Sequence, residues 1–250
     1  MQDYSKKTGV QLIAEERNRQ ITQEGFDTAH DSQFIEEMLA WGAVCYLNPL
    51  RRYLRRQDTP PQMSAPLVRF RQGQKDIPRE GPGEYYVFPQ GIWPKGLGEW
   101  KPTPGDRIRD LVKGCAMGIA EIDRLLEKKG NHGQTGCELV ELERMRQIEK
   151  EGFSREHDRG HIEEELVMAA ICYIKPTREF KKKSPQEPTS YRNIPTTMID
   201  GEEFHIMPSH LWPWDYTFWK PTPTDRVREL VKGCALGAAE IDRLIDRIVN

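Results

Sequence analysis

The chain has 250 residues, of which 30% are charged, with a net charge of −2 and a mean hydropathy of −0.74. This composition excludes wholesale disorder, and the small net charge gives no support to a nucleic-acid or membrane partner. No apolar run approaches the roughly 18 residues that cross a bilayer, and the first residues lack the apolar stretch of a signal peptide. We therefore expect a cytoplasmic protein.

The chain contains a tandem duplication. Two segments recur in its second half: 9–46 returns as 136–173, and 100–125 returns almost verbatim as 219–244. Each unit has about 120 residues, enough to bury a core. The resulting domain prediction has three parts: repeat 1 over 1–129, a linker over 130–136, and repeat 2 over 137–250.

Each repeat predicts three helices in chain order. The first covers 9–23 or 136–150 and ends at a Glu-Gly-Phe sequence, since glycine after a periodic stretch stops a helix. A His-Asp pair follows, and a second helix is expected over 32–47 or 159–174, closed by Pro49 or Pro176. Ile162, Leu166, Ala169 and Tyr173 would share its apolar face.

The third helix follows a Lys-Pro-Thr-Pro sequence, with Asp106 or Asp225 as its N-terminal cap. It carries one apolar stripe, and its small residues Gly114, Ala116, Gly118 and Ala120 predict the close approach of a neighbouring helix. The inserts 48–99 and 175–218 are rich in proline, glycine and aromatic residues. Short strands are expected there at 85–88 and 203–207, within a fold that we predict to be all-α.

Four of the five cysteines are repeat partners, Cys45 with Cys172 and Cys115 with Cys234. They lie in apolar helical patterns and form no Cys-x-x-Cys motif. Buried free thiols in a reducing compartment are therefore expected.

Acidic residues mark the start of the second helix. Glu163, Glu164 and Glu165 are consecutive, so on a helix they point about 100° apart. Glu165 would border the apolar face, where a carboxylate needs a cation or a donor, and Met38 replaces it in repeat 1. An internal ion pair and a metal or ligand role both remain open. The outer acids, including Glu36 and Glu37, are explained by the helix dipole.

Charged residues also recur on the other two helices. The first helix repeats three residues at four-residue spacing, Glu16, Gln20 and Glu24 in repeat 1 and Glu143, Gln147 and Glu151 in repeat 2. A solvated face with intrahelical ion pairs explains part of this pattern. On the third helix Asp106, Arg109, Lys113, Glu121 and Arg124 return as Asp225, Arg228, Lys232, Glu240 and Arg243. Lys232 suits a phosphate as a point charge, and arginine suits it bidentately.

His30-Asp31 and His157-Asp158 are the repeated histidines. The favoured interpretation is an aspartate that caps the next helix with the histidine packed beside it; the alternative is a ligand role. Basic residues of the inserts, Arg51, Arg52, Arg55, Arg56 and Lys181 to Lys183, either rim an anion site or are solvated. The chain has no P-loop, dinucleotide-binding glycine motif, nucleophile elbow or zinc-spaced Cys/His set.

The motifs Glu-Arg-x-Arg-Gln, Glu-Gly-Phe, His-Asp, Trp-Lys-Pro, Leu-Val-Lys-Gly and Ala-Glu-Ile-x-Arg-Leu resemble a group of small bacteriophage and prophage proteins. More distantly, the chain is similar to MazG-like all-α nucleoside triphosphate pyrophosphohydrolases. That resemblance implies two tandem helical bundles forming an intramolecular pseudo-dimer, in an infected bacterial host, and leaves a homo-oligomer open. It also implies Mg²⁺ held by Glu164, Glu165 and Glu240, with Glu165 and Glu240 catalytic. Arg243 stands where the family has aspartate.

The sequence leaves three functions open. The first is Mg²⁺-dependent hydrolysis of a nucleotide, and the second is sequestration of a nucleotide-derived defence signal without cleavage. The third is a structural helical module. The predicted ligand-binding residues are charged or polar and come from both repeats: Lys232, Arg243, Arg228, His157 and Asp158 in repeat 2, and Lys113, Arg124, Glu121, His30 and Asp31 in repeat 1.

Overall fold

A computed structural model describes residues 3–58, 65–73 and 78–249. Each repeat supplies a long first helix, a one-turn helix, a second helix and a long third helix. These are α1 (Gly9–Glu24), α2 (Thr28–Asp31), α3 (Met38–Leu47) and α4 (Arg107–Lys128) in repeat 1, and α5 (Gly136–Glu151), α6 (Arg155–Asp158), α7 (Glu165–Ile174) and α8 (Arg226–Val249) in repeat 2. Short 3₁₀ segments lie at Arg56–Asp58, Leu97–Glu99, Thr189–Asn193 and Tyr216–Phe218.

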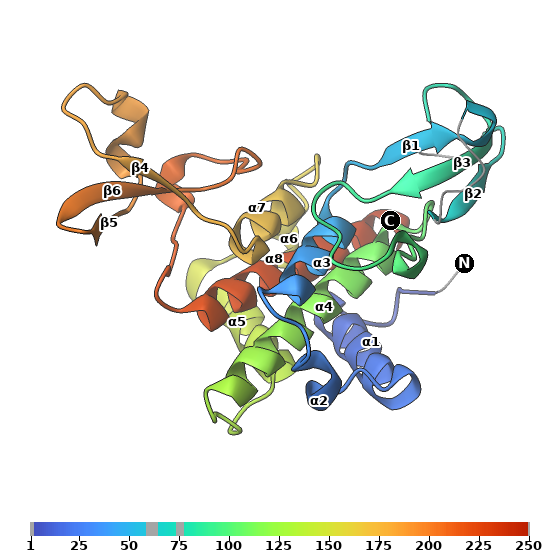
Figure 1. Ribbon diagram of the computed structural model, residues 1–250, viewed down its shortest axis with the longest axis horizontal. Coiled ribbons are helices and arrows are strands. Elements are labelled where there is room, and N and C mark those ends of the chain that lie inside the picture. The colour runs from blue at the N-terminus through green and yellow to red at the C-terminus, as the bar shows by residue number, and fades with distance from the viewer. Residues whose placement is uncertain (1–2, 59–64, 74–77, 250) are drawn as a thin grey trace.

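The prediction of an all-α pair of helical bundles is wrong, because each insert folds into a three-stranded antiparallel sheet. The strand orders are β1-β3-β2 and β4-β6-β5. The strands are β1 (Arg52–Arg55), β2 (Leu67–Phe70), β3 (Gly83–Phe88), β4 (Glu179–Lys182), β5 (Thr196–Ile199) and β6 (Glu202–Met207). The two short strands predicted from sequence are the central ones, and they pair in register with Arg52 opposite Phe88 and Glu179 opposite Met207. The sheets lie on opposite sides of the helical part (Figure 1).

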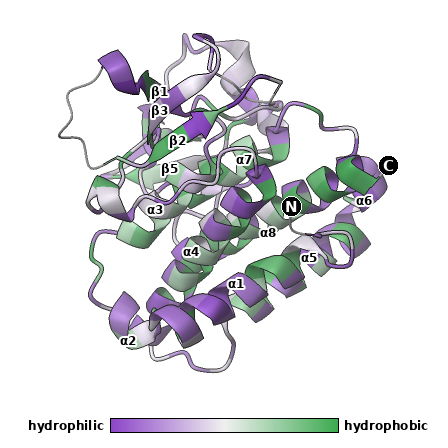
Figure 2. Ribbon diagram, turned by 90° about the vertical axis from the view of Figure 1, so that its right-hand side faces the viewer, coloured by the Kyte–Doolittle hydropathy of each residue, from purple (hydrophilic) through white to green (hydrophobic). Residues whose placement is uncertain are grey.

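The first helices match their predicted limits because both ends carry strong local signals. Thr8 and Thr135 form capping boxes at the N-termini. Gly25 and Gly152 end the helices in the left-handed conformation, with φ of 73° and 74°. In Figure 2, α1 and α5 line one edge of the helical part and show both hydrophilic and hydrophobic residues, as expected for helices with one buried face.

The second helices begin six residues later than predicted. Glu37 and Glu164 precede them in the left-handed conformation, with φ of 56° and 58°. The four outer acids, Glu36, Glu37, Glu163 and Glu164, therefore lie before the helices, and the explanation by first-turn dipole stabilisation is wrong. Ile162 is also outside the helix and 68% exposed, so it does not belong to the apolar face.

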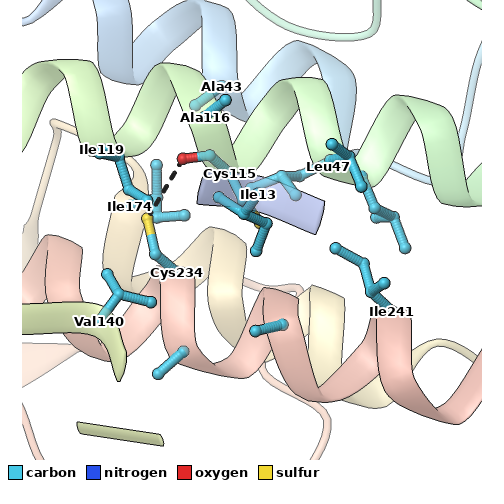
Figure 3. Close-up of a cluster of buried hydrophobic side chains, with 14 of the residues drawn as sticks. Ile13, Ala43, Leu47, Cys115, Ala116, Ile119, Val140, Ile174, Cys234 and Ile241 are labelled. Atoms are coloured by element: carbon cyan, nitrogen blue, oxygen red, sulfur yellow. Dashed lines mark hydrogen bonds between the residues drawn. The ribbon is translucent and has the colours of Figure 1, made fainter. Parts of the chain in front are cut away.

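One hydrophobic core joins both repeats. It includes residues of all six longer helices, with α4 packed against α8 at its centre (Figure 3). A Cβ added at Gly118 of α4 would lie 2.6 Å from Cys234 Sγ, and one at Gly237 of α8 would lie 2.4 Å from Cys115 Sγ. This crossing confirms the predicted role of the small residues. The five cysteines are free, and four of them are buried.

No helix in the described part of the chain is both long and apolar enough to cross a membrane.

Candidate functional site

A cavity of about 290 Å³ lies in repeat 2. Its walls come from α5, α6, α7, α8 and the segment 212–220, which leads from the sheet back to α8. The segment that follows the second sheet therefore forms part of the cavity wall. The volume corresponds to the lower end of small-molecule pockets.

Aromatic rings form a continuous wall of this cavity. In order along the wall they are Phe153, His157, His161, Trp214 and Trp212, with successive centroids 4.9, 5.4, 5.2 and 5.3 Å apart. The first pair is stacked, and the others meet edge-on or tilted. Such a surface favours the stacking of a planar ring.

A charged wall faces the interior from α5. Arg146 binds the carboxylate of Glu143 through Nε and Nη2 at 2.8 and 2.9 Å, and binds Glu151 through Nη1 at 2.9 Å. Arg228 of α8 forms a second ion pair with Glu143, at 2.7 Å. Burial alone would raise the pKa of Glu143, but these two arginines outweigh burial and lower it. Glu143 thus stays ionised and fixes both guanidinium groups.

Lys232 of α8 places an ammonium at the cavity. Its Nζ donates to the carbonyl oxygen of Lys220 at 2.6 Å and to Thr222 Oγ1 at 3.4 Å, and lies 5.5 Å from the centre of the Tyr173 ring. Burial lowers the pKa of Lys232. A partly desolvated ammonium held in one place is suited to an anion.

His157 and Asp158, which were predicted to bind a ligand, line the cavity. The other prediction, that Asp158 caps the next helix, is wrong, because α7 has no side-chain cap. Ser154 caps α6, and Asp158 forms a buried ion pair with Arg144. Asp158 Oδ1 also lies 3.2 Å from Nδ1 of His157. The aspartate thus fixes α6 against α5 and orients the histidine ring. In repeat 1 the same contacts join Asp31 to Arg17 at 2.8 Å and to His30 at 3.1 Å, and Asp27 is the cap.

The three carboxylates predicted as Mg²⁺ ligands each have a partner within the protein. Glu165 Oε2 accepts a hydrogen bond from the backbone N–H of Glu163 at 2.7 Å. Glu164 pairs with Arg107 at 2.6 Å. Glu240 is fully buried, both its oxygens bind Arg243, and burial raises its pKa.

Within the described residues no three His, Cys, Asp or Glu side chains are grouped so as to hold a metal ion. The donor set as it stands does not fit Mg²⁺, because each carboxylate already has another partner. The catalytic roles of Glu165 and Glu240 stay predictions.

The remaining predicted residues fall into two groups. Arg228 and Arg243 do not line the cavity, although Arg228 reaches its wall through Glu143. The repeat 1 residues have matching local partners: Glu121 binds Arg124, and Lys113 binds the carbonyl oxygen of Lys101. They lie away from the repeat 2 cavity.

Sequence reasoning missed the aromatic part of the cavity wall that lies between the sheet and α8. Trp212, Trp214 and Phe218 were not singled out, although the segment Trp-Pro-Trp-Asp-Tyr-Thr-Phe-Trp at 212–219 is the most aromatic of the chain.

The repeated first-helix motif was interpreted in part as a solvated face with intrahelical ion pairs. The ion pair of Arg146 with Glu143 is present, but Glu143, Arg144 and Gln147 are buried and line the cavity. The pairing of this motif with the aromatic segment is a contact over long sequence separation, which a single sequence does not reveal.

Comparison with protein-family models, with curated proteins and with solved structures finds no match to this chain.

Proposed function

We propose that the cavity of repeat 2 binds a nucleotide or a nucleotide-derived small molecule. The observation that carries this proposal is the combination, in one cavity, of an aromatic wall with the ammonium of Lys232 and the guanidinium of Arg146. A base would stack against the His161 and Trp214 rings, and the basic side chains would attract its phosphate.

The net charge of the lining residues favours the binding of an anionic ligand. Four basic residues line the cavity, namely Arg144, Arg146, Lys220 and Lys232, against three carboxylates, Glu143, Glu151 and Asp158. Each carboxylate is paired with Arg144 or Arg146, which leaves Lys220 and Lys232 as the basic side chains of the lining that no carboxylate of the lining neutralises.

Binding without turnover is the form of this function that the geometry favours. Hydrolysis by the expected route needs carboxylates that share a metal ion, and Glu164, Glu165 and Glu240 each have a separate partner. If the resemblance of the sequence motifs to phage proteins holds, this function is the sequestration of a nucleotide signal in the cytoplasm of an infected bacterium. Hydrolysis would instead be established by pyrophosphate release in Mg²⁺ that Glu165→Ala abolishes.

A matched pair of lysine variants tests the proposal. Lys232 and Lys113 make the same contacts in the two repeats, with Lys220 and Tyr173 or with Lys101 and Tyr46. Both Lys232→Met and Lys113→Met should lower the melting temperature similarly. Only Lys232→Met should weaken binding of ATP, AMP, ADP-ribose or cyclic di-AMP, by about tenfold or more, since it removes a charge from the cavity.

The measurement is isothermal titration calorimetry of each nucleotide with the wild type and both variants. Equal loss of affinity in the two variants would contradict a site in repeat 2. No binding and no thermal shift with any of the four nucleotides would leave the structural-module hypothesis standing.

A further inference from the structure

Repeat 1 retains nearly the whole shell of the cavity. Eighteen residues line the cavity in repeat 2, and fourteen of them are identical at the corresponding positions of repeat 1. Their contacts are repeated as well. Arg19 bridges Glu16 and Glu24, and His30 stacks on Phe26 with centroids 4.7 Å apart. The charged wall and part of the aromatic wall therefore exist twice.

Four lining positions differ between the repeats, and three of them meet at one point. His161, Trp214 and Phe218 of repeat 2 correspond to Phe34, Lys95 and Glu99 of repeat 1. In repeat 1 the Lys95 ammonium lies 4.7 Å from the centre of the Phe34 ring and 5.7 Å from that of Phe26. It also forms an ion pair with Glu99 at 3.1 Å.

The fourth differing position is Met117 in repeat 1 and Leu236 in repeat 2, and the methionine fills additional space. A Cβ added at Gly42 of α3 would lie 2.2 Å from Cε and 3.2 Å from Sδ of Met117, so the methionine occupies the place of that side chain. The corresponding residues of repeat 2 are Ala169 and the shorter Leu236. Met117 and Trp93, the counterpart of the cavity residue Trp212, both pack against the buried side chains of Cys45, Tyr46 and Trp100. Repeat 1 thus fills with its own side chains a region that borders the cavity in repeat 2.

We propose that repeat 1 holds a latent second copy of the binding site, whose aromatic wall is occupied by the protein's own Lys95. The Lys95 ammonium lies over the rings of Phe26 and Phe34, and Glu99 neutralises its charge. In repeat 2 the equivalent rings face the cavity. An external ligand must displace Lys95, so each chain binds one ligand and binds it in repeat 2. The identity of that ligand rests on the proposed function; the Lys95 contact does not.

Exchange of the differing residues tests the latent site. The variant Lys95→Trp/Glu99→Phe/Met117→Leu gives repeat 1 three of the four differing residues of repeat 2 and leaves Phe34 in place. The variant Trp214→Lys/Phe218→Glu makes the reverse exchange at two of these positions. Calorimetric titration with ATP, AMP and cyclic di-AMP should give about one site per wild-type chain and about two in the first variant. The second variant should give none, with its thermal unfolding still cooperative.

Two sites in the wild type would overturn the proposal, and so would one site in a first variant with wild-type circular dichroism. Lys95→Ala removes the occupant without adding bulk and should show a second, weaker site. It replaces the first variant as the test if that variant does not fold. One site in Lys95→Ala would then overturn the proposal.

A measurement without ligand separates this proposal from the proposed function. The ε-methylene protons of Lys95 should show upfield ring-current shifts in the nuclear magnetic resonance spectrum, reduced in the variant Phe34→Leu. Ordinary shifts for Lys95 would overturn the occupied wall, whatever the nucleotide titrations show. Failure of every nucleotide to bind, with the upfield shifts present, would refute only the proposed function.

Discussion

Glu165 and Met38 are the first residues of the equivalent helices α7 and α3, and the glutamate alone places a carboxylate at this position. The alignment of the repeats correctly isolated this difference, but its structural context was wrong. The chain turns left-handed at Glu164, with φ of 58°, and the helix begins at Glu165. The carboxylate then accepts a hydrogen bond from the backbone N–H of Glu163, two residues away. Nothing local in three consecutive acids predicts such a turn, which is uncommon for residues other than glycine.

His161 makes the stability of the protein depend on pH. Burial lowers its pKa from the ordinary 6.5; His157 and Arg243 act in the same direction, and Glu165 and Asp158 oppose them. Between the lowered pKa and 6.5 the unfolded chain binds more protons at this residue than the folded chain. Burial of the neutral imidazole therefore carries no penalty at neutral pH. As the pH falls through that window, protonation of His161 favours the unfolded chain and lowers the free energy of unfolding.

The variant His161→Phe introduces the residue that repeat 1 carries at this position. We expect its free energy of unfolding to fall less than that of the wild type between about pH 7.5 and about pH 5.5, because it has no imidazole to protonate. Urea titration at both pH values measures the difference. Parallel losses in the two proteins would show that His161 is not the group responsible.

At the scale of elements, the sequence predicted best the helices whose ends are determined by interactions between residues close in the chain. The first helices were predicted within one residue of their ends, because capping boxes and C-terminal glycines act locally. The central strands β3 and β6 were also found. The outer strands β1, β2 and β4 were missed, since their pairing joins segments across loops and each is only four residues long. The strand β5 was missed although it pairs with β6 through the two-residue turn Asp200-Gly201, which is a local hairpin signal. An all-α fold was inferred because these short strands lack a pattern of their own.

The crossing of α4 and α8 gives a prediction about packing. Gly237→Ala should lower the free energy of unfolding by about 1–3 kcal/mol, because the new Cβ would lie 2.4 Å from the buried Sγ of Cys115. The gain in helix propensity from glycine to alanine, about 1 kcal/mol, offsets only part of this cost. Urea unfolding of the variant measures the net effect.

A double-mutant cycle isolates the contact. Cys115→Ala removes the sulfur atom, so Gly237→Ala should cost much less in that background. Cys234→Ala is the matched control, because Cys234 faces Gly118 and should not rescue the substitution at Gly237. Additive effects of Gly237→Ala and Cys115→Ala would contradict the close approach of the two helices.

At the scale of the whole molecule, the repeats hold each other through reciprocal contacts. The N-terminal amide of α1 at Gly9 donates to Asp242 of α8, and that of α5 at Gly136 donates to Asp123 of α4, at 2.8 and 2.7 Å. Ion pairs also cross between the repeats, from Arg107 to Glu164 and from Arg226 to Glu37, each at 2.6 Å. Each repeat thus satisfies polar groups of the other, and around the cavity the two repeats differ at four lining positions.

Because these contacts are reciprocal, repeat 2 carries both partners of every one of them. Gly136 can meet Asp242 of a second copy, Arg226 can meet Glu164, and Gly237 can meet Cys234. We therefore expect the separate segment 130–250 to form a symmetric homodimer, in which one surface contacts its own copy. Size-exclusion chromatography with light scattering should give about twice the mass of the segment, and Arg226→Ala should shift it toward unfolded monomer. A folded, monomeric segment would show that the core joining the two repeats is dispensable, and would favour two independent domains over one shared unit.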